Sequence, residues 1–495
     1  MASLTIRAGL NASTRLPTSS LLIIGHNRHI KAFSYDELKP KIGECVSEAQ
    51  WKHAVEILPN SGSLPLYFNQ ARIASISDKL SRGNSPANPI EIFKEVKSSS
   101  SLKGSETMNI VLLADYEHVL ASVAAISRSF PTYCRKTGKS EDNISSIEVE
   151  VVVTNGKALT ENDVSFLSAL SHAIREAGRL IDAPANELTT DALVDEAKVV
   201  AASLGLTPTI IQGEELLNQG FGGIYHVGKA GPTPPAFVVL SHKPAGATQT
   251  YALVGKGVVY DTGGMQIKGK TGMPNMKRDM GGAAGFLHAF ATLVKAGFKQ
   301  NLHVCLCIVE NHVSPIANKP DDIIRMLSGK TVEINNTDAE GRLILADGVY
   351  YAKHTLGADT IIDMATLTGA QSYLTGKLHG AVLTNSEDWE LKALQAGKRS
   401  GDMLGPMLFC PEVHFPDLKS KLADMKNSNL GKMNGPPSAV AGLFIGAHIE
   451  FGEGLNWLHL DIAAPAECED RGTGYGPTLM SALLGNDTNV PLLHH

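Results

Sequence analysis

Along the chain, short runs of apolar residues alternate with longer stretches in which apolar residues recur at helical spacing. The short runs predict strands at residues 20–25, 110–113, 147–154, 236–240, 250–259, 304–309 and 361–364. The longer stretches predict helices at residues 119–127, 160–181, 283–294 and 438–449. Strands that alternate with helices in this way are typical of an α/β fold.

The length of 495 residues is large for one hydrophobic core and favours two domains. The predicted helix at 160–181 ends at Asp182-Ala183-Pro184, where proline cannot continue it, and we interpret it as the connector. The sequence therefore predicts an N-terminal α/β domain at 1–159, a connecting helix at 160–184 and a larger C-terminal α/β domain at 185–495. In the larger domain, helices are expected to flank a central mixed sheet.

Acidic residues and lysines collect between positions 256 and 342, each beside glycine and an apolar element. The stretch 336–343 reads N-T-D-A-E-G-R-L, and its two acids would point the same way in an extended segment. The others stand at strand ends and glycine turns, where open α/β sheets form their sites. The cluster contains Lys256, Asp261, Lys268, Asp279, Asp338, Glu340 and Arg342. Carboxylates held together against a core repel each other unless protons or cations intervene, so the cluster predicts a metal site.

Each of these residues also has an ordinary structural explanation. Asp261 and Asp279 could close turns or cap helices, and Asp338 could form an Asx turn. Lys256 could extend from a strand end towards water, and Arg342 could pair with the acid two residues before it. These explanations account for single residues but not for the clustering of all of them between positions 256 and 342, so the metal site is the favoured interpretation.

Four carboxylates carry a charge that two divalent cations would neutralise. Oxygen ligands with one possible amine suit zinc, manganese or magnesium better than copper or an iron–sulfur cluster. Lys256 would have to be neutral to bind a metal, and burial beside cations would lower its pKa in that direction. Two such metals can hold a bridging hydroxide, polarise a carbonyl and stabilise the resulting oxyanion.

The motifs N-T-D-A-E-G-R-L, G-K-G-x-x-x-D-x-G-G and K-R-D-M-G-G-A-A resemble those of the leucyl (cytosol) aminopeptidase family of two-metal exopeptidases. The resemblance covers roughly residues 165–490 and is weak over the first 150. The divergent N-terminal part and the motif D-T-G-G-x-Q-I-K resemble those of an animal side branch of that family.

The resemblance implies a role for each matched residue. Lys256, Asp261, Asp279 and Glu340 would hold a tighter metal, and Asp261, Asp338 and Glu340 a looser one. Lys268 would be the electrophile that stabilises the tetrahedral oxyanion. Arg342 would hold a bicarbonate ion that acts as general base towards the metal-bound water. The free α-amine of the substrate would bind a metal and Asp279, which explains an exopeptidase.

The implied activity is release of N-terminal leucine and other hydrophobic residues from short peptides by a metal-bridging hydroxide. The implied cofactors are two divalent metals per subunit, zinc first, with manganese or magnesium as alternatives. The implied assembly is a homohexamer, a dimer of trimers. The S1 pocket would be lined by Met276, Asn336, Thr366, Gly369 and Ala463. Ala466 stands where the family pattern has methionine, and this change would admit larger side chains.

Composition excludes several other classes of protein. The net charge of −6 and the lack of basic blocks argue against nucleic acid as a ligand. The longest apolar stretch, 438–449, is too short to span a membrane. The six cysteines form no CxxC and favour free thiols in a reducing compartment. Residues 1–35 lack acids, as organelle-targeting segments do, but 20–25 is strand-like, so a cytoplasmic location is predicted.

Two other functions stay open. One is a two-metal phosphatase with the same carboxylates, although the chain has no Walker sequence; the absence of HExxH excludes a zincin. The other is an inactive relative that serves as an assembly or binding module. Retention of Lys268 and Arg342 disfavours this second alternative, because an inactive protein has no chemical need for them. His459 and Asp461 alternate in a strand-like segment and are predicted to be structural.

Overall fold

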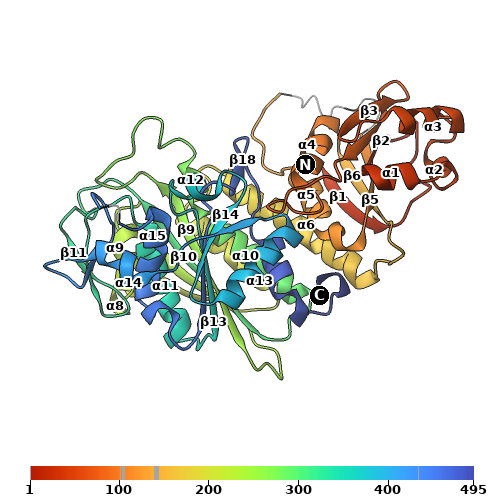
Figure 1. Ribbon diagram of the computed structural model, residues 1–495. Helices are drawn as coiled ribbons and strands as arrows, with labels where there is room; N and C mark the ends of the chain where they lie inside the picture. The colour runs from red at the N-terminus through yellow and green to blue at the C-terminus, as the bar shows by residue number, and fades with distance from the viewer. Residues whose placement is uncertain (1, 101, 103–105, 139–143, 433, 495) are drawn as a thin grey trace. The chain divides into compact units, whose positions relative to one another are not determined.

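The computed structural model describes residues 2–100, 102, 106–138, 144–432 and 434–494. The chain divides into two compact units: unit 1 contains residues 1–175, 397–401 and 489–495, and unit 2 contains 176–396 and 402–488 (Figure 1). The division falls within helix α6 (Glu161–Asp182), which is the helix predicted at 160–181. The domain boundaries drawn from the sequence stay a prediction.

Unit 1 is built on a six-stranded sheet with the order β1-β6-β5-β2-β4-β3. Neighbouring strands run parallel except β3 and β4. The strands are β1 (Ser3–Ala8), β2 (Ser20–His26), β3 (Gly62–Leu66), β4 (Ala71–Ile76), β5 (Thr107–Ala114) and β6 (Ser146–Val153). The helices are α1 (Asn27–Ala32), α2 (Tyr35–Ile42), α3 (Glu48–Ile57), α4 (Pro89–Ser99), η1 (Tyr116–His118) and α5 (Val119–Arg128). These bounds confirm the strands and the helix predicted for this part of the chain.

Unit 2 contains the predicted mixed sheet, with eight strands in the order β15-β14-β17-β13-β9-β10-β8-β7. The central strands β17, β13, β9 and β10 run parallel, and β14 and β8 flank them in antiparallel pairing. The strands are β7 (Thr209–Gln212), β8 (Ala236–His242), β9 (Thr250–Asp261), β10 (Asn301–Asn311), β13 (Thr360–Ala365), β14 (Gly380–Thr384), β15 (Leu404–Pro406) and β17 (Asn456–Asp461). Two small sheets contain β11 (Ile323–Arg325), β12 (Thr331–Glu333) and β16 (Met425–Lys426), and β18 (Glu467–Cys468) with β19 (Arg471–Gly472).

Helices α10 (Gly281–Lys295) and α11 (Gly341–His354) cover opposite faces of the large sheet (Figure 1). On β9, Gly255 faces α10, because a Cβ added there would lie 2.7 Å from the Ala283 Cα. Its neighbour Val254 faces α11, where a Cβ added at Gly348 would lie 2.6 Å from the Val254 Cγ1. Successive strand residues point to opposite faces, so the two helices enclose the sheet.

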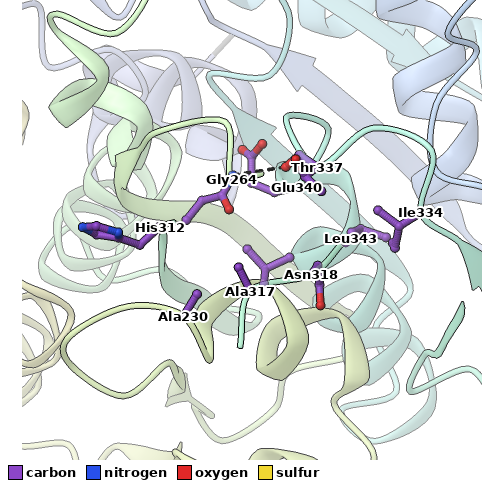
Figure 2. A pocket seen from close by; sticks show the side chains of 11 residues that line it. Ala230, Gly264, His312, Ala317, Asn318, Ile334, Thr337, Glu340 and Leu343 are labelled. Atoms are coloured by element: carbon purple, nitrogen blue, oxygen red, sulfur yellow. Dashed lines mark hydrogen bonds between the residues drawn. The ribbon is translucent and has the colours of Figure 1, made fainter. Parts of the chain in front are cut away.

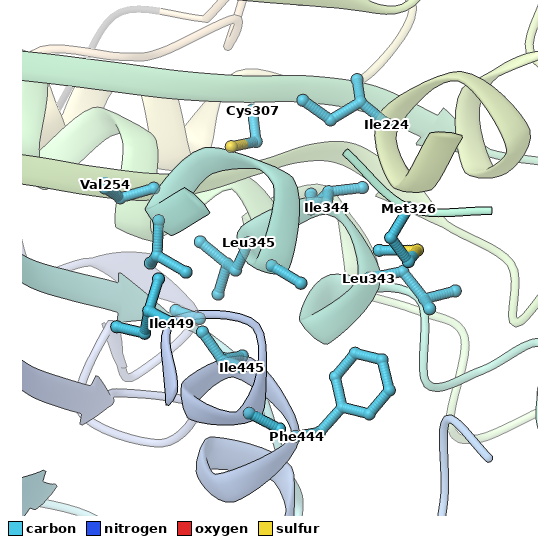
Figure 3. Close-up of a cluster of buried hydrophobic side chains, with 14 of the residues drawn as sticks. Ile224, Val254, Cys307, Met326, Leu343, Ile344, Leu345, Phe444, Ile445 and Ile449 are labelled. Atoms are coloured by element: carbon cyan, nitrogen blue, oxygen red, sulfur yellow. The ribbon is translucent and has the colours of Figure 1, made fainter. Parts of the chain in front are cut away.

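The core of unit 2 packs α11 against α15 (Pro437–Ala447), the helix predicted at 438–449 (Figure 3). Leu345 of α11 and Phe444 and Ile445 of α15 belong to this core. The remaining helices of the chain are α7 (Thr190–Ser203), α8 (Glu214–Asn218), α9 (Gly222–Gly228), η2 (Met276–Met280), α12 (Gln371–Thr375), α13 (Glu387–Ser400), α14 (Pro411–His414), η3 (Phe415–Leu418), η4 (Glu450–Gly452), α16 (Pro477–Leu484), η5 (Gly485–Asp487) and η6 (Pro491–Leu493).

Two further predictions can be compared with the fold. The six cysteines are free, and Cys305 and Cys307 are buried in β10, where burial raises the pKa of both thiols. Within the described ranges, no helix combines the length and the apolar character that crossing a bilayer requires. The parallel strands β9, β10 and β13 end at one edge of the sheet, which is where sites form in α/β proteins.

Candidate metal centre

Strand β9 carries two of the predicted residues, Lys256 in its interior and Asp261 at its end. The chain turns directly after the strand because Gly263 adopts a φ of +85°, a conformation that favours glycine. The Asp261 Oδ1 accepts hydrogen bonds from the Gly263 N–H at 2.9 Å and from the Asn311 Nδ2 at 2.8 Å. Its Oδ2 lies 2.7 Å from the Lys268 Nζ. The fold thus holds one oxygen, and the other faces a cation.

Asp279 lies in η2, immediately before α10. This helix begins directly against the sheet, because a Cβ added at Gly282 would lie 2.0 Å from the Met364 carbonyl oxygen of β13. The Asp279 Oδ1 accepts hydrogen bonds from the Lys256 Nζ and the Thr366 Oγ1, both at 2.8 Å. The glycines that follow Asp279 therefore bring its carboxylate to the end of β13.

Asp338 and Glu340 lie in a turn that leads into α11, which we call the acidic loop (residues 335–340). The Ala339 N–H donates to the Asn336 carbonyl oxygen at 3.2 Å, and Glu340 has helical angles (φ −78°, ψ −37°). The expectation of an extended segment, with both acids on one face, was therefore wrong. The side chain of Asp338 is 36% exposed and that of Glu340 is 3% exposed, so the two reach the site from different depths.

Three of the four predicted carboxylates nevertheless converge. Oxygens of Asp261, Asp338 and Glu340 lie within 4.8 Å of one another. The Lys268 Nζ contacts both Asp261, at 2.7 Å, and Asp338. This trio is the set that the resemblance assigned to the looser metal.

Lys256 connects the trio to the fourth carboxylate. Its Nζ lies 2.7 Å from the Asp279 Oδ2 and 2.9 Å from the Glu340 Oε1, and it donates to the Thr366 carbonyl oxygen at 3.0 Å. Burial lowers the pKa of Lys256, but Asp279, Glu340 and Asp261 raise it, and the result lies well above the ordinary value. The predicted lowering of this pKa concerned an amine beside bound cations, so it stays a prediction.

The cluster keeps an excess of negative charge after its lysines and Arg342 are counted. Four carboxylates, two ammonium groups and the Arg342 guanidinium leave a net formal charge of −1. Burial first, and then Asp261, raise the pKa of Glu340 to about 8. Burial also raises the pKa of Asp279 to about 6, although Lys256 opposes it. A buried group of oxygen donors with unbalanced negative charge fits divalent metal ions.

Arg342 lies in the first turn of α11 and is 7% exposed. Its Nη1 donates to the Asn427 carbonyl oxygen at 3.0 Å, and its Nε has no hydrogen-bond partner among the residues that the structure describes. The alternative in which Arg342 simply pairs with Glu340 is not seen in the described part of the chain. A buried guanidinium with an unused N–H fits a small anion such as bicarbonate.

The sequence reasoning missed Asn427, which is fully buried and holds the acidic loop. Its Oδ1 accepts hydrogen bonds from the N–H groups of Asn335 at 2.9 Å and Asn336 at 3.2 Å. Its Nδ2 donates to the carbonyl oxygens of Asn336 at 2.6 Å and Ala339 at 3.2 Å. Since its own carbonyl accepts from Arg342, one residue positions both the loop and the guanidinium. No local pattern marks it, because it lies 85 positions from Arg342.

His459 and Asp461 lie on β17, as the strand-like pattern predicted, and their structural role stays a prediction. The His459 Nδ1 contacts the Asp363 Oδ1 at 2.5 Å. The Asp461 Oδ1 accepts hydrogen bonds from the N–H groups of Leu367 at 3.1 Å and Ala463 at 3.2 Å. Asp461 thereby ties the segment that follows β13 to Ala463.

The residues assigned to the S1 pocket are Met276, Asn336, Thr366, Gly369 and Ala463. Thr366 contacts the carboxylate of Asp279, and Asn336 belongs to the acidic loop. Ala463 is held next to the segment after β13, which also carries the exposed Gly369. Met276 lies on the same short helix as Asp279. The pocket role of these five residues stays a prediction.

Ala466, the position at which this chain departs from the family pattern, is fully buried. A Cβ added at Gly281 would lie 3.5 Å from the Ala466 Cβ. A substrate side chain reaches Ala466 only if neighbouring atoms move, so its effect on the S1 pocket stays a prediction.

A small cavity lies beside Glu340, lined also by Gly264, Thr337 and Asn318 (Figure 2). Its volume is about 10 Å³, which is enough for about one water molecule. The cavity is therefore too small to be the substrate pocket.

Comparisons with known proteins cover both parts of the chain. Residues 175–481 match the family described as "Cytosol aminopeptidase family, catalytic domain", and residues 19–139 match "M17 aminopeptidase N-terminal domain 2". Leucine aminopeptidase 1 of Caenorhabditis elegans is 60% identical over 100% of both chains. The solved structure of C. elegans leucine aminopeptidase (LAP1) has a TM-score of 0.95 and 58% identity, and it covers 99% of this chain and 100% of that chain. The bottromycin maturation enzyme BotP, solved in complex with Mn, has a TM-score of 0.76 and 26% identity over 95% of this chain and 100% of that chain.

Proposed function

The chain belongs to the cytosol aminopeptidase family and is a metallo-aminopeptidase, and from this premise we propose that it releases N-terminal leucine and other hydrophobic residues from short peptides. The observation that carries the proposal is the convergence of three carboxylates within 4.8 Å, next to Lys268. Arg342, which is buried with an unused N–H, supports it further.

The family consists of two-metal peptidases, and we propose which residues hold the metals in this chain. They are Lys256, Asp261, Asp279, Asp338 and Glu340. Zinc is the first choice, with manganese or magnesium as alternatives. When bound there, the two ions supply the Lewis acidity that activates a water molecule and polarises the scissile carbonyl. The unbalanced negative charge of the cluster and its oxygen donors support this assignment.

Lys268 is proposed as the electrophile. Its side chain is 16% exposed and lies 2.7 Å from Asp261. Burial lowers the pKa of Lys268, but Asp261 and Glu340 raise it above the ordinary value, so the ammonium keeps its charge. A charged donor that is already in place stabilises the negative charge that develops on the scissile carbonyl oxygen.

Arg342 is proposed to hold a bicarbonate ion, which would supply a general base near the scissile bond. The unpartnered Nε supports an anion at this position. Asp279 is proposed to bind the free α-amine of the substrate, so that an internal peptide, which lacks this amine, is not cleaved. Met276, Asn336, Thr366, Gly369 and Ala463 would surround the first side chain.

We also propose that the chain assembles as a homohexamer, a dimer of trimers, and acts in the cytoplasm. The resemblance to the family supports both statements. Light scattering during size-exclusion chromatography measures the assembly, and a stable active monomer would contradict it.

The proposed function is tested with protein stripped of metal and reloaded with zinc, manganese or magnesium. A leucine amide reporter should be cleaved only after metal is restored, and its N-acetylated form should not be cleaved. Cleavage of the acetylated reporter at a similar rate would overturn the exopeptidase assignment. Absence of cleavage with every metal, despite bound metal, would favour the inactive relative.

A further inference from the structure

Unit 1 contains a cavity of about 380 Å³ that lies outside the metal centre. We call it the histidine pocket; its lining includes His26, Arg28, Asp78, Arg82, His118 and Lys398. All of these residues belong to unit 1, because Lys398 lies in the segment 397–401. Pockets of about 300–1,000 Å³ are typical of small-molecule sites. The histidine pocket is therefore large enough for a small ligand.

Two histidines of this pocket have ring nitrogens without partners. His26 is 4% exposed, and neither of its nitrogens has a hydrogen-bond partner among the described residues. The same holds for the His118 Nδ1, and the two rings lie 5.7 Å apart between centroids. The Asp78 Oδ1 lies 3.4 Å from the His26 Nδ1 without forming a hydrogen bond. Because buried polar atoms are nearly always paired, these nitrogens point to a ligand.

The charge that is left unpaired in the histidine pocket is positive. Arg28 is neutralised, since it pairs with Asp78 through one nitrogen and with Asp115 at 2.8 Å through another. Arg82 and Lys398 are exposed, and neither has a hydrogen-bond or ion-pair partner within the described ranges. Two exposed cations that line a cavity attract anions.

The histidines themselves are neutral donors and acceptors. Burial, followed by Arg28, lowers the pKa of His26, and burial lowers that of His118 although Asp115 opposes it. A neutral imidazole offers one N–H donor and one acceptor. Neutral imidazoles can also bind zinc, but Arg82 and Lys398 would repel a metal ion. The lining therefore favours an oxyanion.

We propose that the histidine pocket binds a phosphate group, either as free phosphate or on a small organic molecule. Arg82 and Lys398 hold its negative oxygens, and a ring N–H of His26 donates to it from the buried side. The rest of an organic phosphate would lie against Leu80 and Pro86, which also line the cavity. This site is independent of the aminopeptidase reaction.

The test is isothermal titration calorimetry on the metal-loaded full-length chain, with glucose 6-phosphate, inorganic phosphate and glucose as probes. At least one phosphate probe should bind, glucose should not, and the tighter probe identifies the source of the phosphate group. The double variant Arg82→Ala/Lys398→Ala should bind at least about tenfold more weakly, because two charge-assisted contacts are lost. Lys39→Ala/Lys94→Ala removes two other exposed cations of unit 1 and should bind as the unchanged protein does.

Three results would overturn the proposal. The first is that neither phosphate probe binds. The second is that Arg82→Ala/Lys398→Ala binds phosphate as tightly as Lys39→Ala/Lys94→Ala does, which would place the phosphate at the metal centre. The third is a zinc ion, found by mass spectrometry, that His26→Gln releases while phosphate affinity is unchanged. Unaltered hydrolysis of leucine amide by Arg82→Ala/Lys398→Ala would show that this variant is folded.

Discussion

Asn427→Ala should disable the metal centre without removing any predicted ligand or catalytic group. The side chain of Asn427 makes four hydrogen bonds to the backbone of the acidic loop, at distances from 2.6 to 3.2 Å. Alanine removes all four and leaves two N–H and two carbonyl groups without this partner. The loop that carries Asp338 and Glu340 is then free to move away from Asp261.

The size of the effect follows from these contacts. A hydrogen bond contributes about 0.5–1.5 kcal/mol net, and a buried group left unpaired costs about 1–3 kcal/mol. Water can reach Asn336, which is half-buried, so we expect a total of about 2–5 kcal/mol, split between stability and metal binding. Loss of a residue that orients metal ligands typically lowers metal affinity or activity about 10- to 100-fold.

The assay combines three readouts on one preparation: the zinc affinity, the kcat for leucine amide and the melting temperature. Asn427→Asp keeps the Oδ1 acceptor but turns a buried carboxylate oxygen towards the carbonyl oxygens of Asn336 and Ala339, so it should be at least as damaging as alanine. Asn429→Ala is the matched control, because among the described residues its Nδ2 donates only to the Lys432 carbonyl oxygen, at 3.3 Å.

Two results would refute this reasoning. If Asn427→Ala keeps its zinc affinity and its kcat within about twofold, the acidic loop holds its shape without Asn427. If the melting temperature falls but metal affinity and kcat do not, Asn427 stabilises the fold and does not position the site.

Four further predictions follow from the site and the core. Lys268→Ala and Arg342→Ala should each lower kcat by about two decades or more with metal still bound, and loss of metal in either would make that residue a ligand. Asp279→Ala should lose metal as well as rate, measured by metal content after dialysis; retention of both would remove Asp279 from the ligand set. Ala466→Met should lower the ratio of phenylalanine amide to leucine amide hydrolysis, and an unchanged ratio would place Ala466 outside the S1 pocket. Burial lowers the pKa of His448 to about 3, below the value of about 6.5 expected in the unfolded chain. The contribution of neutral His448 to the unfolding free energy should therefore be complete above about pH 6.5. On acidification towards about pH 3 it should fall by about 1.4 kcal/mol per pH unit. Urea unfolding of His448→Gln should show a shallower decline with falling pH.

Much of unit 2 could be predicted from the sequence because its signals are local. The runs that became β9, β10 and β13 are apolar on both faces, as strands buried between helices must be. Asp261 and Asp279 could be recognised because glycines follow each of them, and a glycine is needed where the chain turns sharply or meets another backbone closely.

The sequence by itself determined the strands β9, β10 and β13, the helices α10 and α15, and the set of acids and lysines that gather at the sheet edge. Only the tertiary structure decided that the acidic loop is a turn held by Asn427, that carboxylates raise the pKa of Lys256, and that His26 and Lys398 share a cavity. Each of these depends on atoms that are distant in sequence and close in space. Hydrogen bonds and charges act over a few ångströms, so their partners are known only once the chain has folded.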